Sequence, residues 1–109
     1  MALRPVALNP IVALPVTALS TYVNSHAVAG TVTEAVPESP NGAWRVVIST
    51  DAVAWFRLNS VAAAPVGSTV NGTASFMIGV GQARIFDCTP GDEINVAGTA
   101  NVSFEYFAS

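Results

Sequence analysis

The sequence predicts an all-β protein: an antiparallel β-sandwich or jelly roll with an extended N-terminal arm. Short runs of alternating apolar and polar residues recur over residues 28–109, and turn-forming residues separate them. Residues 1–27 are instead apolar and interrupted by proline. A period of two places alternate side chains on opposite faces of a strand. Because 109 residues fit one domain, we expect an arm over 1–27 and a β-sandwich domain over 28–109.

The arm is defined by Pro5, Pro10 and Pro15, which stand at five-residue spacing. Proline prevents a regular helix and confines a strand to the edge of a sheet. Such an arm either folds back on its own sandwich or lies across a neighbouring subunit, and the sequence leaves both open. If it lies across a neighbour, the expected contact residues are Leu3, Arg4, Val6, Leu8, Ile11 and Leu14.

The strands follow from the alternating runs, beginning with an early strand over 28–36. Four runs place these residues on an inward face: Trp44, Val46 and Ile48; Ala54, Phe56 and Leu58; Ala74, Phe76 and Ile78; Val102, Phe104 and Tyr106. Ile85 marks a further strand, and Ile94 with Val96 marks another. Three of these faces carry a phenylalanine, a large apolar residue, so we expect Phe56, Phe76 and Phe104 in the core.

Several connections carry specific turn chemistry. The pairs Asn41-Gly42 and Asn71-Gly72 favour type I′ hairpins, in which both central residues have positive φ. The run Thr89-Pro90-Gly91-Asp92 favours a type II turn, with proline at the second position and glycine at the third. Gly79 and Gly81 indicate a loose hairpin or a bulge.

Composition indicates a surface covered by partners. Hydrophobic residues make up 51% of the chain and charged residues 10%, whereas a soluble domain typically has about 25% charged residues. The four basic residues are all arginine. A free monomer depends on a charged surface to stay dispersed, and this chain has little material for one. An uncharged surface of Ser, Thr and Asn is the alternative.

Charge and length argue against several classes of protein. The net charge of −3 disfavours a nucleic-acid partner, which requires a positive stripe. The most apolar stretch, residues 5–19, is too short and too rich in proline to span a membrane, and it makes a poor secretory leader. The single cysteine cannot form an internal disulfide, which favours a reducing compartment or a fold indifferent to redox state.

Candidate chemical groups are few, and we expect no enzyme activity, cofactor or metal. His26, the one histidine, is expected in a loop, although it could in principle activate Cys88 as a nucleophile. Cys88 is better explained as a small buried residue at the end of a strand. Asp87, Asp92 and Glu93 could offer oxygen ligands to calcium, but acidic residues are common in turns and the spacing is not that of an EF-hand.

Two tryptophans occur on successive predicted strands. Trp44 and Trp55 could form a platform for a sugar, because aromatic faces stack on apolar sugar faces. The more ordinary expectation is that one lies in the core and the other at an interface. We therefore add Trp55 and its outward-facing neighbour Arg57 to the expected interaction residues.

The order of elements over residues 44–107 resembles small structural proteins encoded in tailed-phage head gene clusters. An apolar strand over 52–58 precedes a loop rich in Gly, Ser and Thr, and a short apolar run over 75–81 ends in glycine. A strand over 83–88, a Pro-Gly turn and a final segment beginning Gly98-Thr99-Ala100 follow. These are strand and turn patterns without a catalytic signature. The resemblance implies a β-sandwich virion component such as a capsid cement or decoration protein, and it transfers no site residues.

The expected function is therefore to bind and stabilise a capsid shell through apolar contacts. The expected partners are the major capsid protein and further copies of the chain, as a dimer or trimer, with no nucleic acid or membrane. The expected location is the capsid surface of the virion, after synthesis in the host cytoplasm. Two alternatives remain open: a tail or head-fibre component, and a carbohydrate-binding β-sandwich module using Trp44 or Trp55.

Overall fold

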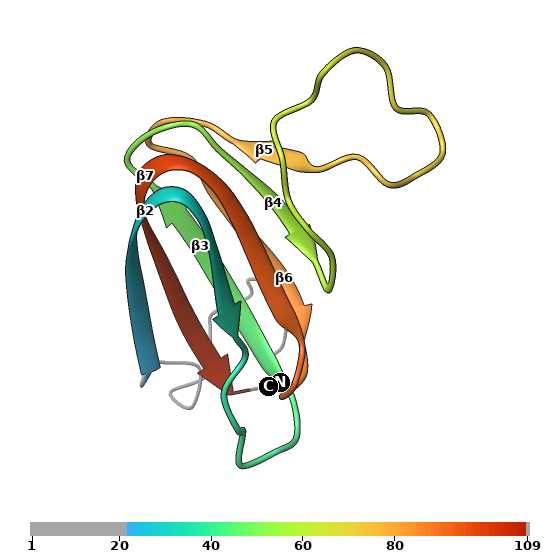
Figure 1. Ribbon diagram of the computed structural model, residues 1–109. Coiled ribbons are helices and arrows are strands. Elements are labelled where there is room, and N and C mark those ends of the chain that lie inside the picture. Colours follow the sequence, from blue (N-terminus) through green and yellow to red (C-terminus); the bar gives the residue numbers. More distant parts are fainter. Residues whose placement is uncertain (1–21, 109) are drawn as a thin grey trace, which may run out of the picture.

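The computed structural model describes residues 22–108, which form six β-strands and no helix (Figure 1). The strands are β2 (Tyr22–Ala35), β3 (Trp44–Thr50), β4 (Ala54–Leu58), β5 (Phe76–Ile78), β6 (Ala83–Cys88) and β7 (Glu93–Ala108). All of them pair antiparallel within one sheet. The predicted all-β antiparallel fold is confirmed. In this part of the chain no helix is long and apolar enough to cross a membrane.

The six strands are arranged as four long ones. β3 and β4 lie end to end along one edge of β7, with Thr50 opposite Val102 and Ala54 opposite Gly98. β6 and β5 lie end to end along the far side of β3 and β4 in the same way. β2 pairs with the other edge of β7 along 14 residues. β2 and the β5–β6 pair therefore form the two edges of the sheet.

A bend crosses the sheet at its middle. Gly30 of β2 lies opposite Gly98 of β7, and their φ angles of 111° and 143° are accessible mainly to glycine. A Cβ atom at Gly98 would also lie 3.2 Å from the Val53 carbonyl oxygen. Residues 51–53 separate β3 from β4, and residues 79–82 separate β5 from β6. These features curl the sheet into a half-barrel whose two halves face each other (Figure 1).

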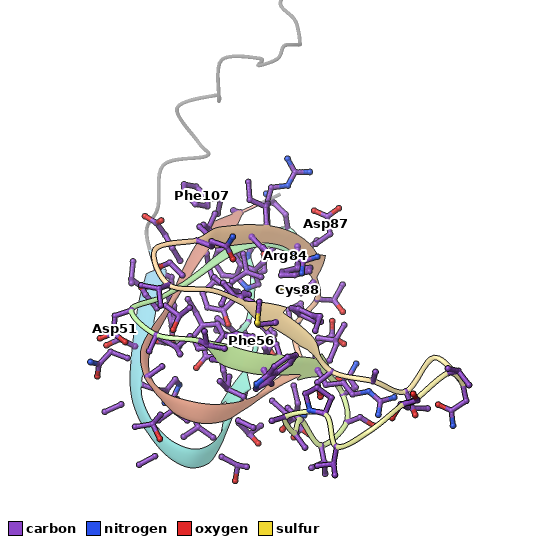
Figure 2. The ribbon with its side chains drawn as sticks, turned by 90° about the horizontal axis from the view of Figure 1, so that it is seen from above. Asp51, Phe56, Arg84, Asp87, Cys88 and Phe107 are labelled. Atoms are coloured by element: carbon purple, nitrogen blue, oxygen red, sulfur yellow. The ribbon has the colours of Figure 1, made fainter. Side chains whose placement is uncertain are left out.

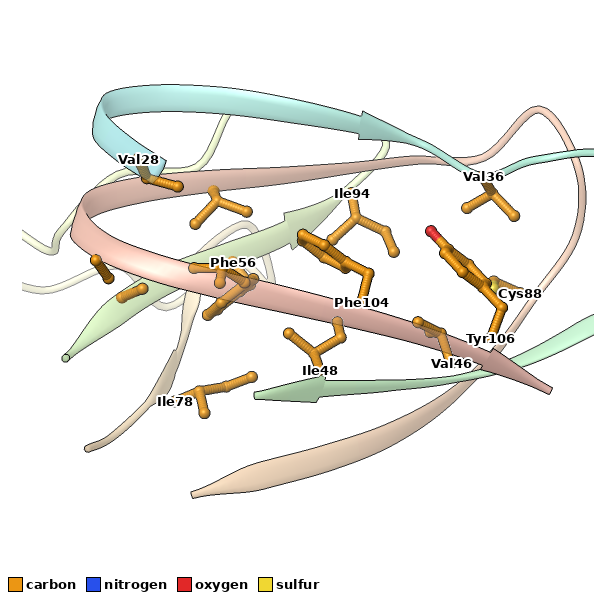
Figure 3. Packing of buried hydrophobic residues seen from close by; sticks show 14 of the residues in the cluster. Val28, Val36, Val46, Ile48, Phe56, Ile78, Cys88, Ile94, Phe104 and Tyr106 are labelled. Carbon is orange, nitrogen blue, oxygen red and sulfur yellow. The ribbon is translucent and has the colours of Figure 1, made fainter. Parts of the chain in front are cut away.

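The core lies on the concave face, which the even-numbered residues of the strands form (Figure 3). Residues opposite each other across antiparallel strands share a face, and every register here pairs even with even. The expected inward positions at Trp44, Val46, Ile48, Ala54, Phe56, Ile78, Val102, Phe104 and Tyr106 are all buried, and so are Ile94 and Val96, which the sequence marks only as part of a strand. The predicted faces are confirmed at these positions.

Three residues predicted to face the core are not fully buried. Leu58 is 48% exposed because β4 ends there. Ala74 is exposed and lies before β5, which begins only at Phe76. Phe76 is half-buried and packs against the core rather than within it, since β5 is an edge strand of three residues. A short edge strand has few neighbours to cover it.

The boundary between arm and domain also differs from the expectation. β2 begins at Tyr22 rather than at residue 28, so residues 22–27 belong to the sheet and not to an arm. Pairing with the long strand β7 decides this, because Tyr22 lies opposite Tyr106. The described residues form one curled sheet, and the two-sheet packing of a sandwich or a jelly roll is not confirmed.

Of the three turns predicted with a defined type, one is present and two are not. The type II turn is confirmed: Asp92 N donates to Thr89 O at 3.1 Å, and Gly91 has a φ of 92°. Both type I′ predictions are wrong, because Asn59 is the one non-glycine with positive φ among residues 22–108. Gly42 N donates to Ser39 O, so Asn41 is the third residue of a turn that begins before proline. The 71–72 pair lies within the long loop that connects the antiparallel strands β4 and β5, rather than in a two-residue hairpin turn.

Candidate functional site

A buried carboxylate stands at the centre of the main polar cluster. Glu34 is 3% exposed, and its side chain makes three contacts of 2.7 Å. Asn24 Nδ2 and the Tyr106 hydroxyl donate to Oε2, while His26 Nε2 lies beside Oε1. We call these four residues the Glu34 cluster. A buried carboxylate is tolerated when several donors surround it, as they do here.

The bend in β2 creates the Glu34 cluster. Asn24 and His26 precede Gly30 and Glu34 follows it, and all three side chains lie on the concave face of one strand. Folding the strand at Gly30 brings the carboxylate over the first half of β2. Tyr106 comes from the end of β7, 72 residues away in sequence. The cluster therefore links the two halves of the half-barrel at the β2 edge.

The chemistry of this cluster is that of a structural link. Burial and the hydrogen bond to Glu34 raise the pKa of the Tyr106 phenol far above its ordinary value, so the hydroxyl stays protonated and donates. The Tyr106 side chain is fully buried and offers no access to a substrate. His26 packs edge-to-face on Phe104, with ring centroids 5.8 Å apart. The prediction of a loop histidine is wrong, because β2 includes residue 26.

The sequence contains a signal for this cluster that the predicted sites did not include. Asn24, His26 and Glu34 share the even numbering of Val28 and Val32. A polar residue at an inward position of an alternating run must find a partner. Which partner it finds could not be read from the pattern, because the bend at Gly30 sets it.

Cys88 is buried at the end of β6, as predicted. Burial, followed by the nearby negative charges of Asp92 and Asp87, raises the pKa of its thiol to about 11. A nucleophilic cysteine requires the opposite shift. The only histidine of the chain is engaged with Glu34, so the structure offers no support for a Cys–His pair.

We expect Cys88 to resist alkylation in the folded protein. A rise in pKa from 9.0 to about 11 lowers the thiolate fraction at neutral pH about 100-fold, since each unit is a factor of ten. Iodoacetamide labelling at neutral pH, followed by mass spectrometry, should be complete in urea and minimal without it. Rapid labelling of the folded chain would show that the end of β6 opens readily.

Of the acidic residues near the Pro90-Gly91 turn, Asp92 stabilises the turn itself. Asp92 accepts from the Thr89 backbone and hydroxyl and from Asn59 Nδ2, and these bonds lower the pKa of its carboxyl. Asp87 forms a surface pair with Arg45 at 3.1 Å. Within residues 22–108, no three His, Cys, Asp or Glu side chains are grouped as metal ligands would be.

A small apolar pocket of about 60 Å³ opens between the end of β4 and β6. Its lining residues are Val46, Ile48, Leu58, Phe76, Phe86, Asp87, Cys88 and Ile94. Sites for small molecules usually measure about 300–1,000 Å³. This pocket is therefore a packing defect at the open side of the half-barrel rather than a substrate site. Arg84 covers the nearby Phe76 and Phe86 rings at 4.9 and 5.4 Å.

The two tryptophans lie on opposite faces of the sheet. Trp44 is buried, and its indole N–H donates to Pro37 O at 2.9 Å. Trp55 is half-buried on the convex face, opposite the exposed Met77 of β5. A shared sugar platform is therefore ruled out, and the expectation of one core tryptophan is confirmed. Arg57 lies two residues beyond Trp55 on the same face.

The loop over residues 59–75 protrudes from the half-barrel between β4 and β5 (Figure 1). Val66 and Val70 are 96% and 95% exposed, and Val61 is 81% exposed. No charged residue occurs between Arg57 and Arg84. The loop is held at its base, where Ala63 N donates to Ser75 Oγ and Ala62 is buried. Its tip extends away from the body of the protein (Figure 2).

The predicted interaction residues are thus only partly placed. Trp55 and Arg57 lie on the strand that leads into the 59–75 loop. Leu3, Arg4, Val6, Leu8, Ile11 and Leu14 lie outside the described residues. The exposed valines of the loop were missed, because a run of small and apolar residues between strands gave no sign of its exposure.

Comparison with known proteins identifies no relative: no family model, no curated protein and no solved structure matches this chain.

Proposed function

We propose that this protein is a structural subunit without catalytic activity that binds a larger protein assembly through the loop at residues 59–75. One observation carries the proposal. The loop extends three nearly bare valines into solvent on a segment without charge. Exposed apolar residues gathered on one feature are typical of protein-binding surfaces.

Trp55 and Met77 extend this surface onto the convex face beside the loop. They lie opposite each other on β4 and β5, the strands that enter and leave the loop. Aromatic residues and methionine are enriched at interfaces. We call the loop together with Trp55 and Met77 the docking surface. Burying apolar area contributes about 25 cal/mol per Å², and many copies on one particle multiply the effect.

We propose further that the assembly is a tailed-phage particle and that the protein is a cement or decoration protein bound to the major capsid protein. The strand and turn order over residues 44–107 supports this assignment by resemblance. Its location would then be the outer surface of the head. A tail or head-fibre position is the competing outcome within the same class.

The first test asks whether the protein is part of a particle. Virions of the phage that encodes it should contain the chain when purified and analysed by mass spectrometry. Immunogold labelling should place it on heads. Labelling of tails or fibres would overturn the cement assignment, and absence from purified virions would overturn the phage assignment altogether.

The second test concerns the docking surface. The double variant Val66→Ser/Val70→Ser should bind more weakly than the wild type to head shells that lack this protein. The affinity should fall by at least about tenfold for each valine replaced, since a buried valine contributes about 1.5–3 kcal/mol. Val80→Ser is the matched control, because Val80 is exposed but lies outside the loop. Copies bound are counted after sedimentation.

The salt dependence of binding shows which force holds the complex together. Binding should change little between low and high salt, because apolar burial is not screened. Equal binding by the double variant and the wild type would overturn the role of the loop. Loss of wild-type binding at high salt would show that arginine and acidic side chains dominate the contact instead.

A further inference from the structure

The two edges of the sheet differ in how they are protected against pairing with another strand. Edge strands expose unpaired backbone groups, and proteins usually blunt them with charges, bulges or short length. One edge of this sheet consists of β5 and β6, and the other consists of β2 alone. Among the described strands, β2 pairs only with β7.

The β5–β6 edge carries the usual protective features. A turn over Gly79–Gln82 interrupts it, and neither strand exceeds six residues. Arg84 and Asp87 lie on β6 and are both exposed. A second strand approaching this edge would meet both charges and could pair only over a short length.

Apart from its bend at Gly30, the β2 edge carries none of these features. It is 14 residues long, and it contains no proline, lysine or arginine. Its one carboxylate, Glu34, is turned inward and buried with His26 beside it. The unpaired backbone groups along this edge are therefore flanked on the convex face by small exposed side chains, among them Ser25, Ala27 and Ala29.

The ladder shows which backbone groups face outward. Val36 N donates to Asp92 O at 2.9 Å, which continues the β2–β7 register by one pair. In an antiparallel ladder, alternate residues bond to the same neighbour. The even residues of β2 therefore bond to β7, and the N–H and C=O groups of Val23, Ser25, Ala27 and Ala29 point away from the sheet.

We propose that β2 pairs antiparallel with β2 of a second copy, which joins two half-barrels through one continuous sheet. Antiparallel pairing of identical strands is self-complementary, as a twofold dimer requires. Residues 22–29 before the bend provide the pairing length. The interface is distinct from the docking surface, since the 59–75 loop arises between β4 and β5.

The N-terminal residues are a poorer occupant of this edge. Pro10 and Pro15 differ by an odd number, so in one extended strand their missing donors would fall on opposite sides. A strand that contained both prolines would therefore turn one of them toward β2, where it could not donate a hydrogen bond. A second β2, free of proline, has no such defect.

The test is the oligomeric state of the full chain by analytical ultracentrifugation. The wild type should be a dimer at micromolar concentrations. Ala27→Pro removes an outward donor and should weaken dimerisation more than tenfold. Ala83→Pro is the matched control, because Ala83 begins β6 and its N–H points outward on the protected edge. Circular dichroism checks that each variant is folded.

A second pair of variants guards against misfolding caused by proline. Ala27→Lys places like charges near the twofold axis and should also give monomers, whereas Ala83→Lys should not. Amide hydrogen exchange should show protection at Ser25 and Ala27 that disappears in the monomeric variants. A dimeric Ala27→Lys and Ala27→Pro, or a monomeric wild type, would overturn the proposal.

The experiments can overturn the dimer and the capsid role independently, although both concern assembly. A monomeric wild type with protected β2 amides would show that residues 1–21 cover the edge of their own chain, and it would overturn only the dimer. A dimer that fails to bind head shells would overturn only the capsid role.

Discussion

Replacing Phe104 with alanine should lower the free energy of unfolding by about 3–5 kcal/mol, the usual range for a fully buried phenylalanine. Phe104 is 0% exposed in the middle of the concave face of β7. It lies opposite Ile48 on one side and Asn24 on the other, and His26 packs against its ring. Truncation would leave a cavity between the two halves of the half-barrel. Urea denaturation followed by circular dichroism measures the loss.

Phe107 provides the control for this substitution. It lies on the same strand but on the opposite, convex face, and it is only half-buried. Phe107→Ala should therefore cost much less than Phe104→Ala. Phe56→Ala should resemble Phe104→Ala, and Phe76→Ala should fall between, because Phe76 stacks on Phe56 from the short edge strand β5. Equal losses for residues 104 and 107 would mean that the inward face is wrongly assigned.

Replacing Glu34 with leucine should destabilise the protein by several kcal/mol even though it adds an apolar residue to the core. The change removes the acceptor for Asn24 and Tyr106 and the partner of His26. Each buried donor left unsatisfied costs on the order of 1–3 kcal/mol. Since Tyr106 is fully buried, its hydroxyl cannot turn to water. The measurement is again the free energy of unfolding in urea.

The control is Glu93→Leu, because Glu93 is an exposed carboxylate at the start of β7. It should change stability little, as most surface substitutions do. Tyr106→Phe alone should cost about 1.5–3 kcal/mol, the range for a bond to a charged group. The double variant Glu34→Leu/Tyr106→Phe should cost less than the sum of the two single changes, because it removes donor and acceptor together. Strict additivity would show that the two side chains do not interact.

Local features of the chain were predictable because their causes lie within a few residues. The alternation around Val46 and Phe104 fixed which side chains face inward, since successive side chains of a strand point to opposite faces. The Pro90-Gly91 turn was predictable for the same reason: proline and glycine set the φ angles of the turn themselves. The Asn41-Gly42 turn was not, because the preceding proline moved the turn by one residue.

The sequence alone thus determined that the protein is all-β, which face of most strands carries the apolar core residues, that Trp44 and Cys88 are buried, and where the type II turn lies. Only the tertiary structure decided that the bend at Gly30 and Gly98 curls one sheet into a half-barrel. The bend brings Glu34 to Tyr106, and the strand order leaves β2 as an edge while extending the 59–75 loop into solvent. These features depend on which strands pair across long separations, and a period of two is the same for every possible pairing.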